Sequence, residues 1–319
     1  MYGAQGVGAL KEVLVHCPGD ELDILEPVNL KEYLFDALVD KDEAIDEHRE
    51  FVTSLEGLGV KVHQLVDVIG QSRSVDFTGA MTDVIKRLPN MFFMRDLAVI
   101  TADGAIIASM RFPARSVEPV VVKSVLAGLG IKILCDIKPP ATLEGGDILF
   151  LDKDTMLVGA GERTDDDGFY EVKKVWLKDG RTLAKIPITA FRGSMHLDTV
   201  LGIISGTCVV VHADSIGDVT SFEMQSGQTI ESHAPVKAFF SSRGYDVIEV
   251  TSAEQYNMAC NTLMIEPGKR LLCYHRGFKA SLPNLASRGV ELTGLHLPQL
   301  FIGGGGPHCM TLELKREAA

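Results

Sequence analysis

The sequence lacks the motifs of several common classes of site. It contains neither GxGxxG nor GxxxxGK[ST], so the glycine-rich phosphate loops of dinucleotide- and nucleotide-binding proteins are missing. It also contains no HExxH pair and no zinc-finger spacing of histidine and cysteine. The six cysteines are scattered without a CxxC, which in a chain of 319 residues is typical of reduced cytoplasmic proteins. We therefore expect a cytoplasmic protein that holds no metal.

Positive charge and long apolar runs are also scarce. The 31 lysines and arginines are outnumbered by 43 aspartates and glutamates, so nucleic acid and anionic membrane surfaces are poor partners. An acidic field favours the approach of a small cation, although such surfaces often serve solubility alone. No apolar run reaches the roughly 18 residues of a membrane helix, and the N-terminus lacks the pattern of a secretory signal.

What the chain does contain is an internal repeat. Four segments start with a polar residue and continue with an apolar run, a turn and a second apolar run, which predicts a hairpin in each. The polar residues are Asp96, Asp147, Asp198 and Asn261, with spacings of 51, 51 and 63 residues. A partial fifth copy, KEVLVHCPG, lies near the N-terminus. Equivalent residues of units packed around a shared centre should converge there, whereas strand-start caps would face solvent instead.

The intervals between the hairpins are predicted to form a helix followed by a strand. Residues 43–65, 116–136 and 234–250 show this pattern most clearly. Five units of hairpin, helix and strand account for the length of the chain, and none can bury its faces alone. We expect a mixed α/β fold in which residues 1–319 form a single domain, a closed ring of five modules.

The C-terminal segment GGGGPHCM (303–310) predicts a bare loop that delivers Cys309. Glycines allow a backbone to approach a buried site without side-chain clashes. The apolar alternation that follows predicts a strand that anchors the loop. His308 would point away from the side of the thiol if this segment were extended, so it ranks below His196 as a base.

Polar clusters elsewhere fit a site of unusual chemistry. LEGGD places Glu144 and Asp147 around two glycines, and MHLD places His196 and Asp198 on one face of an extended segment. A thiol and a histidine indicate covalent catalysis. Carboxylates, however, raise the pKa of a thiol, so their presence makes sense if the substrate is a cation such as a guanidinium.

Together these motifs resemble those of the arginine deiminases, members of the guanidino-modifying enzyme superfamily with a five-bladed ββαβ propeller fold (the pentein fold). The matching segments are NMFFMRD (90–96), RFPAR (111–115), LEGGD (143–147), GERT (161–164), MHLD (195–198), NTLMIEPGK (261–269) and GGGGPHCM (303–310). The resemblance implies hydrolysis of free L-arginine to citrulline and ammonia, without a cofactor.

The resemblance also implies roles for individual residues. Cys309 would be the nucleophile and His196 the general acid and base. Asp96 and Asp198 would grip the guanidinium, with Glu144 as partner of the histidine. Substrate-binding residues would be Arg115 and Arg163 on the α-carboxylate, together with Asn90, Phe93, Asp147 and Gly303.

Two departures from the family pattern and several alternatives remain at this stage. The interval 34–90 leaves no room for the usual helical insert, and Gly304 stands where many members have an arginine. The alternatives are a methylated-arginine hydrolase of the dimethylarginine dimethylaminohydrolase kind, an arginine dihydrolase, an amidinotransferase, or a non-enzymatic binding protein on the same fold. A homodimer or a higher homo-oligomer is an open expectation.

Overall fold

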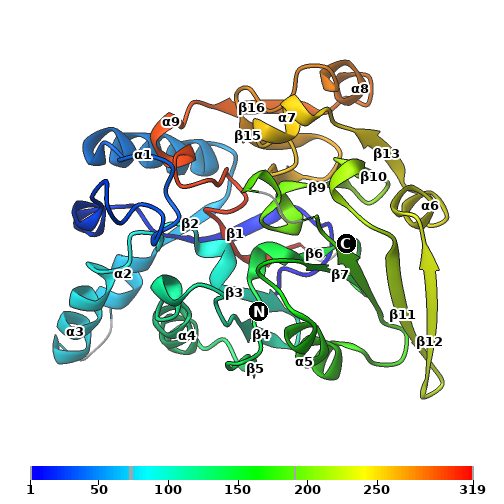
Figure 1. Cartoon of the computed structure of the whole chain (residues 1–319), viewed down its shortest axis with the longest axis horizontal. Helices are drawn as coiled ribbons and strands as arrows, with labels where there is room; N and C mark the ends of the chain where they lie inside the picture. Colours follow the sequence, from blue (N-terminus) through cyan, green and yellow to red (C-terminus); the bar gives the residue numbers. More distant parts are fainter. Residues whose placement is uncertain (1, 72–74, 190–191, 318–319) are drawn as a thin grey trace.

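The computed structural model describes residues 2–71, 75–189 and 192–317, which form five β-sheets (Figure 1). Four of these sheets have three strands and one has five. In spatial order they are β17 (Leu312–Arg316), β1 (Leu10–Val15), β2 (Lys61–Gln64); β3 (Ala98–Thr101), β4 (Gly104–Ile107), β5 (Ile133–Asp136); β6 (Ile148–Phe150), β7 (Thr155–Ala160), β8 (Thr182–Pro187), β11 (Val219–Gln225), β12 (Gln228–Ala234); β9 (Leu201–Ser205), β10 (Cys208–Val211), β13 (Asp246–Glu249); and β14 (Leu263–Glu266), β15 (Arg270–Tyr274), β16 (Glu291–Leu295).

Every sheet is built on the same unit. An antiparallel pair is followed by a helix, and the next strand then joins the pair in parallel orientation. In one sheet the antiparallel pair joins the two ends of the chain, because β17 pairs with β1. The connecting helices are α1 (Lys41–Gly57), α4 (Glu118–Gly128), α5 (Asp166–Trp176), α6 (Val236–Ser241) and α8 (Leu282–Ala286). The predicted mixed α/β fold is confirmed, and the five sheets are compatible with the predicted five-bladed propeller.

Local chemistry explains where these elements begin and end. The Asp40 side chain accepts from the backbone N–H of Glu43, which caps α1, and Asp165 caps α5 in the same way. The β3–β4 turn depends on Gly104, whose φ is 140° and where a Cβ would lie 2.6 Å from a backbone carbonyl. Gly244, with φ 79°, ends the α6 segment as predicted.

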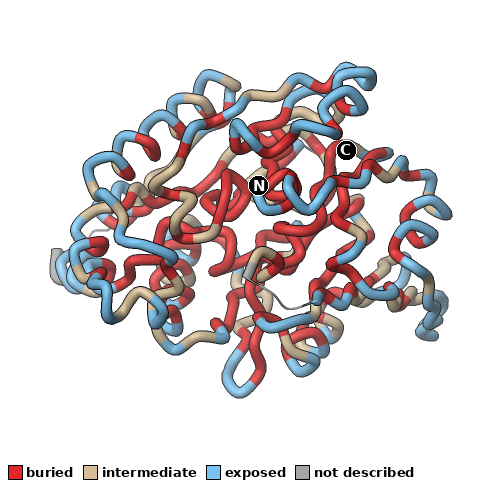
Figure 2. The backbone as a smooth tube through the Cα atoms, turned by 45° about the horizontal axis from the view of Figure 1, so that its top comes forward, coloured by how far each residue is buried: buried red, intermediate tan, exposed pale blue. Residues whose placement is uncertain are grey.

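The helices lie on the outside and the sheets face one another across the centre. Figure 1 shows α1, α4, α5, α6 and α8 spaced around the periphery. Figure 2 shows the buried backbone gathered in the middle of the molecule and the exposed backbone around its rim. Each of three sheets is entered through a buried 3₁₀ turn, and these turns carry the repeated aspartates.

Several elements were not predicted. The hairpin β11–β12 follows β10 and joins the sheet of the preceding unit through β8, which accounts for the longer final spacing of the repeat. Two helices, α2 (Leu65–Gly70) and α3 (Val75–Ile85), lie in the interval that we expected to be too short for the usual helical insert; α7 (Ser252–Tyr256) and α9 (Pro298–Phe301) are also additional. Among the described residues, no helix combines the length and apolar character needed to cross a membrane.

Candidate active site

Three 3₁₀ turns form the floor of the candidate site. They span Met94–Leu97, Gly145–Asp147 and Leu197–Thr199, and each directly precedes the first strand of its sheet. The second turn contacts both of the others. The repeat therefore places Asp96, Asp147 and Asp198 in equivalent turns, as the sequence spacing predicts. All three carboxylates are buried.

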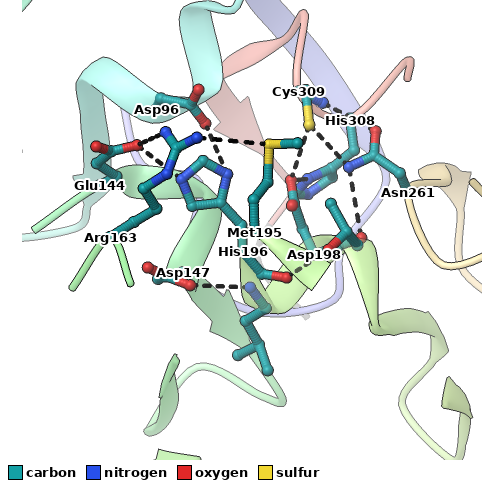
Figure 3. A network of polar contacts seen from close by, with 12 residues as sticks. Asp96, Glu144, Asp147, Arg163, Met195, His196, Asp198, Asn261, His308 and Cys309 are labelled. Carbon is teal, nitrogen blue, oxygen red and sulfur yellow. Dashed lines mark hydrogen bonds and ion pairs between the residues drawn. The ribbon is translucent and has the colours of Figure 1, made fainter. Parts of the chain in front are cut away.

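The glycine loop brings Cys309 over these turns. A Cβ at Gly303 would lie 2.7 Å from the Phe93 ring, and a Cβ at Gly305 would lie 2.9 Å from the Cβ of Cys309. Only glycine permits this approach. The loop is fastened by Asn261, whose Oδ1 accepts from the backbone N–H of Cys309 at 3.2 Å and whose Nδ2 lies 2.9 Å from the Sγ (Figure 3). The predicted anchoring strand is β17.

A pocket with about 350 Å³ of empty volume opens beside the thiol. Its lining consists of Leu34, Asn90, Phe93, Asp96, Arg115, Arg163, Met195, His196, Gly303, Gly304, Gly305 and Cys309. Most of the predicted site residues thus meet at one pocket of a size suited to a small molecule. Glu144, Asp147 and Asp198 are not part of the lining.

Glu144 lies behind the pocket and holds His196. The Nε2 of His196 is 2.8 Å from Glu144 Oε2, and its Nδ1 is 3.7 Å from Asp96 Oδ1. The other oxygen of Glu144 accepts from the backbone N–H of Arg111 at 2.9 Å. Burial lowers the pKa of His196, but the two carboxylates outweigh burial and raise the pKa to about 9. The imidazole is therefore protonated at neutral pH and is suited to donate a proton.

The environment of Cys309 disfavours its thiolate. Burial, then Asp198 and Asp96, raise the pKa of the thiol well above its usual value. The Sγ lies 3.5 Å from Asp198 Oδ2. A positive charge that entered the pocket would act in the opposite direction and favour ionisation of the thiol.

The two predicted arginines are both paired with carboxylates of the site. Arg115 contacts Asp96 Oδ2 through Nη1 at 2.7 Å and Glu118 Oε2 through Nε at 2.9 Å. Arg163 contacts Glu144 Oε2 through Nη1 at 3.1 Å, and its guanidinium lies 4.6 Å above the ring of Phe112. Arg115 is fastened from two sides, whereas Arg163 is held by a single oxygen contact of ordinary length.

Two predicted aspartates lie elsewhere than expected for groups that touch a ligand. Asp147 accepts from the hydroxyl of Thr164 at 2.6 Å and from the backbone N–H of Leu197 at 2.9 Å, so both of its oxygens already hold neighbouring turns together. Asp198 touches the thiol but lines a second cavity, on which His308 also lies. His308 Nδ1 is 2.7 Å from Asp198 Oδ2, away from the pocket.

Sequence reasoning left some residues of the site without a role. Asn261 was singled out only as a member of the repeat, yet it contacts both the thiol and its backbone. Met195 lines the pocket, and its sulfur lies 4.0 Å from Arg163. Leu34 also lines the pocket, with a φ of 65° that non-glycine residues seldom adopt. The polar position before β14 was a usable signal for Asn261; nothing in the sequence marked Met195.

One group of side chains has the spacing of metal ligands. Within the described part of the chain, Asp96, Glu144 and His196 alone offer three donor atoms within 4.8 Å of one another. Arg115 and Arg163 already supply positive charge to the two carboxylates. The same three donors would suit the N–H groups of a guanidinium, and that the protein works without metal stays a prediction.

Comparison with known proteins identifies the family. A model of the family described as "Arginine deiminase" matches residues 71–316. The chain belongs to the arginine deiminase family. The arginine deiminase of Rhodococcus erythropolis is 28% identical over 392 aligned positions, which cover 98% of this chain and 96% of the relative. The arginine deiminase of Mycobacterium tuberculosis is 27% identical, over 98% of this chain and 97% of the relative.

Solved structures of related enzymes share the fold of this arginine deiminase family member. The substrate-bound N-terminal domain of a cyanobacterial arginine dihydrolase aligns with a TM-score of 0.74 at 16% identity, covering 96% of this chain and 98% of that one. Dimethylarginine dimethylaminohydrolase from Pseudomonas aeruginosa, complexed with citrulline, aligns with a TM-score of 0.68 at 18% identity, covering 95% and 99%. At these identities the likeness concerns the fold alone.

Proposed function

We propose that the protein hydrolyses the guanidinium group of free L-arginine to citrulline and ammonia, with Cys309 as nucleophile. The observation that carries the proposal is the meeting of a buried thiol, a protonated histidine and buried carboxylates around one small pocket, in a chain of the arginine deiminase family. In the same proposal the five sheets are the blades of a propeller, and residues 1–319 act as one catalytic domain.

The substrate itself supplies the charge that the thiol needs. Asp96 Oδ1 and Asp198 Oδ1 are buried and have no hydrogen-bond partner among the residues that the structure describes. A guanidinium has five N–H donors in a planar fork and would satisfy such acceptors. Its positive charge beside Cys309 offsets the effect of the carboxylates and favours the thiolate. The nucleophile is thus activated when the correct cation is bound.

The reaction then follows in two steps. The thiolate attacks the guanidinium carbon, His196 gives its proton to the departing nitrogen, and ammonia leaves. An S-alkylthiouronium remains on Cys309. The neutral imidazole of His196 next takes a proton from water, the resulting hydroxide attacks the same carbon, and the tetrahedral adduct expels the thiolate to give citrulline. Covalent catalysis divides one difficult hydrolysis into two easier steps.

Arg163 is the group that changes partner when the substrate binds. Its contact with Glu144 is a single 3.1 Å hydrogen bond, and its Nε has no hydrogen-bond partner among the described residues. The substrate guanidinium takes over the negative charge of Glu144 and Asp96, and Arg163 turns to the α-carboxylate. Arg115 stays clamped between Asp96 and Glu118 and contributes its charge from a fixed position.

The deciding experiment incubates the protein with L-arginine and measures citrulline, ornithine and ammonia. We expect one citrulline and one ammonia per arginine, and loss of at least about a thousandfold in kcat for Cys309→Ala. Cys135→Ala is the matched control, because that thiol is half-buried and does not line the pocket; it should retain full activity.

Other products would redirect the proposal. Ornithine with two ammonia molecules would indicate a dihydrolase, and turnover of methylated arginine alone would move the substrate while keeping the chemistry. Transfer of the amidino group to an added amine would indicate an amidinotransferase. A folded protein that turns over none of these compounds would refute the enzymatic proposal in favour of a binding protein.

A further inference from the structure

Two histidines lie side by side on the surface because of a strand register. β15 and β16 are parallel and pair Tyr274 with Leu295, the last residue of each strand. The next residue of each strand is a histidine, His275 and His296, and both are exposed. The backbone N–H of His275 donates to the carbonyl of Leu295 at 2.8 Å, which keeps the two positions in register. Neither residue lines the pocket beside Cys309.

The hydrogen bonds define which imidazole nitrogens can bind a ligand. His275 Nδ1 lies 3.1 Å from the carbonyl oxygen of Leu295, and since a carbonyl only accepts, this nitrogen carries the proton. Its Nε2 then presents a lone pair. Metal-ligating histidines are usually oriented in this way, with the second nitrogen donating to a carbonyl or a carboxylate.

The separation of the two rings matches a chelate. His275 Nε2 and His296 Nδ1 are 3.4 Å apart, and the ring planes are inclined at 73°. Two nitrogens bound at about 2.0–2.1 Å to a tetrahedral ion lie roughly 3.3–3.4 Å apart. At 3.4 Å a direct N–H···N hydrogen bond would be long. The pair is therefore spaced for an ion between the rings.

We propose that His275 and His296 form a surface site for a divalent transition metal ion of the zinc, nickel and copper class. Imidazole nitrogen suits these ions. The chain carries a net charge of −12, and Glu47 is close enough to His296 for a charge on that imidazole to lower the pKa of the Glu47 carboxyl. Among the described residues no third histidine, cysteine or carboxylate joins this pair, so water completes the coordination. The site is separate from the proposed chemistry at Cys309.

The test uses Ni²⁺ as the probe and tag-free protein that carries Cys309→Ala, which removes the pocket thiol as a competing ligand. Isothermal titration calorimetry should show one bound ion per chain. His275→Ala and His296→Ala, each made in this background, should weaken binding by at least tenfold, because each removes one of two protein ligands. Both side chains are exposed, so the variants should retain the circular dichroism spectrum of the parent.

His233→Ala is the control, since His233 is an exposed histidine that lies 3.3 Å from the carboxylate of Glu231. This variant should bind Ni²⁺ as the parent does. Binding that is unchanged in both His275→Ala and His296→Ala would place the ion elsewhere, for instance on Asp96, Glu144 and His196, and would overturn the proposal. Absence of any binding at millimolar Ni²⁺ would also overturn it.

Discussion

Two buried arginine–glutamate pairs in this molecule differ in how completely they are closed. Arg316 meets Glu313 through Nε at 2.6 Å and through Nη2 at 2.8 Å, which is a bidentate contact. Its Nη1 donates to the carbonyls of Gly8 and Met264. Each nitrogen of this guanidinium is used, and the contacts join β17 to the N-terminal segment and to β14.

Arg163 and Glu144 form the open counterpart. Both side chains are buried, as in the closed pair. Only one nitrogen of Arg163 reaches an oxygen within hydrogen-bonding distance, and a second lies 4.0 Å from the sulfur of Met195. Glu144 is well satisfied by its other partners, His196 and the backbone of Arg111. Arg163 can therefore leave without stranding the carboxylate.

The difference shows how one pair of residue types can serve two purposes. Charges removed from water require full hydrogen bonding to be tolerated, so a closed pair is costly to disturb and acts in the fold. An open pair retains unused donors and a replaceable partner, which suits a group that must exchange contacts with a substrate. The contrast leads to three predictions, taken from the largest effect to the smallest.

The closed pair should dominate stability. Arg316→Met leaves Glu313 buried, and removal of one partner from a buried pair costs about 3–5 kcal/mol. The lower end is expected, because Arg95 remains 3.7 Å from Glu313. Urea unfolding measures the loss, with Arg163→Met as the matched variant, which should cost less than about 1 kcal/mol. Equal losses for the two variants would show that the distinction between closed and open pairs is wrong.

The two clusters should also fail at opposite ends of the pH scale. The pKa of His196 is raised to about 9, so its stabilising contribution is complete below the usual value of 6.5 and is lost as the pH rises through 9. That contribution amounts to about 3 kcal/mol. Burial raises the pKa of Glu313, but Arg316 and Arg95 outweigh it and lower the pKa to about 2, so its contribution is lost only as the pH falls from 4.5 towards 2.

Urea unfolding at a series of pH values measures this difference. The free energy of unfolding of wild type, minus that of His196→Gln, should shrink between pH 6.5 and pH 9. The same subtraction with Glu313→Gln should stay flat over that interval. A His196 difference that does not change with pH would mean that the folded protein does not hold this imidazole protonated.

The sequence predicts the frame of the site because the frame is local and repeated. The even spacing of Asp96, Asp147 and Asp198 identifies equivalent turns, and the glycines before Cys309 indicate a close backbone approach. Hairpin and helix signals within each unit depend on neighbouring residues, so 116–136 and 234–250 form the predicted helix and strand. The five resulting sheets follow from these local patterns.

The partners of the charged groups could not be predicted, because they depend on contacts between units. Nothing in the spacing distinguishes Asp96, which lines the pocket, from Asp147, whose oxygens bind Thr164 and Leu197. The hairpin β11–β12 was missed because it joins the sheet of another unit. The pairing of His275 with His296 likewise depends on the register of two parallel strands separated by a helix.

The smallest predicted effect concerns substrate selection by the open pair. Arg163→Met removes a charged hydrogen-bond donor from the substrate carboxylate, which is worth about 1.5–3 kcal/mol, or roughly 10–150-fold in kcat/KM for L-arginine. The loss should fall mainly on KM, because the carboxylate is bound equally in the ground state and the transition state. Agmatine has the guanidinium but no carboxylate, so its slower turnover should change little, and the preference for arginine over agmatine should collapse. If both substrates lost activity equally, Arg163 would act on the guanidinium end through Glu144 and His196, and the proposed exchange of partners would be wrong.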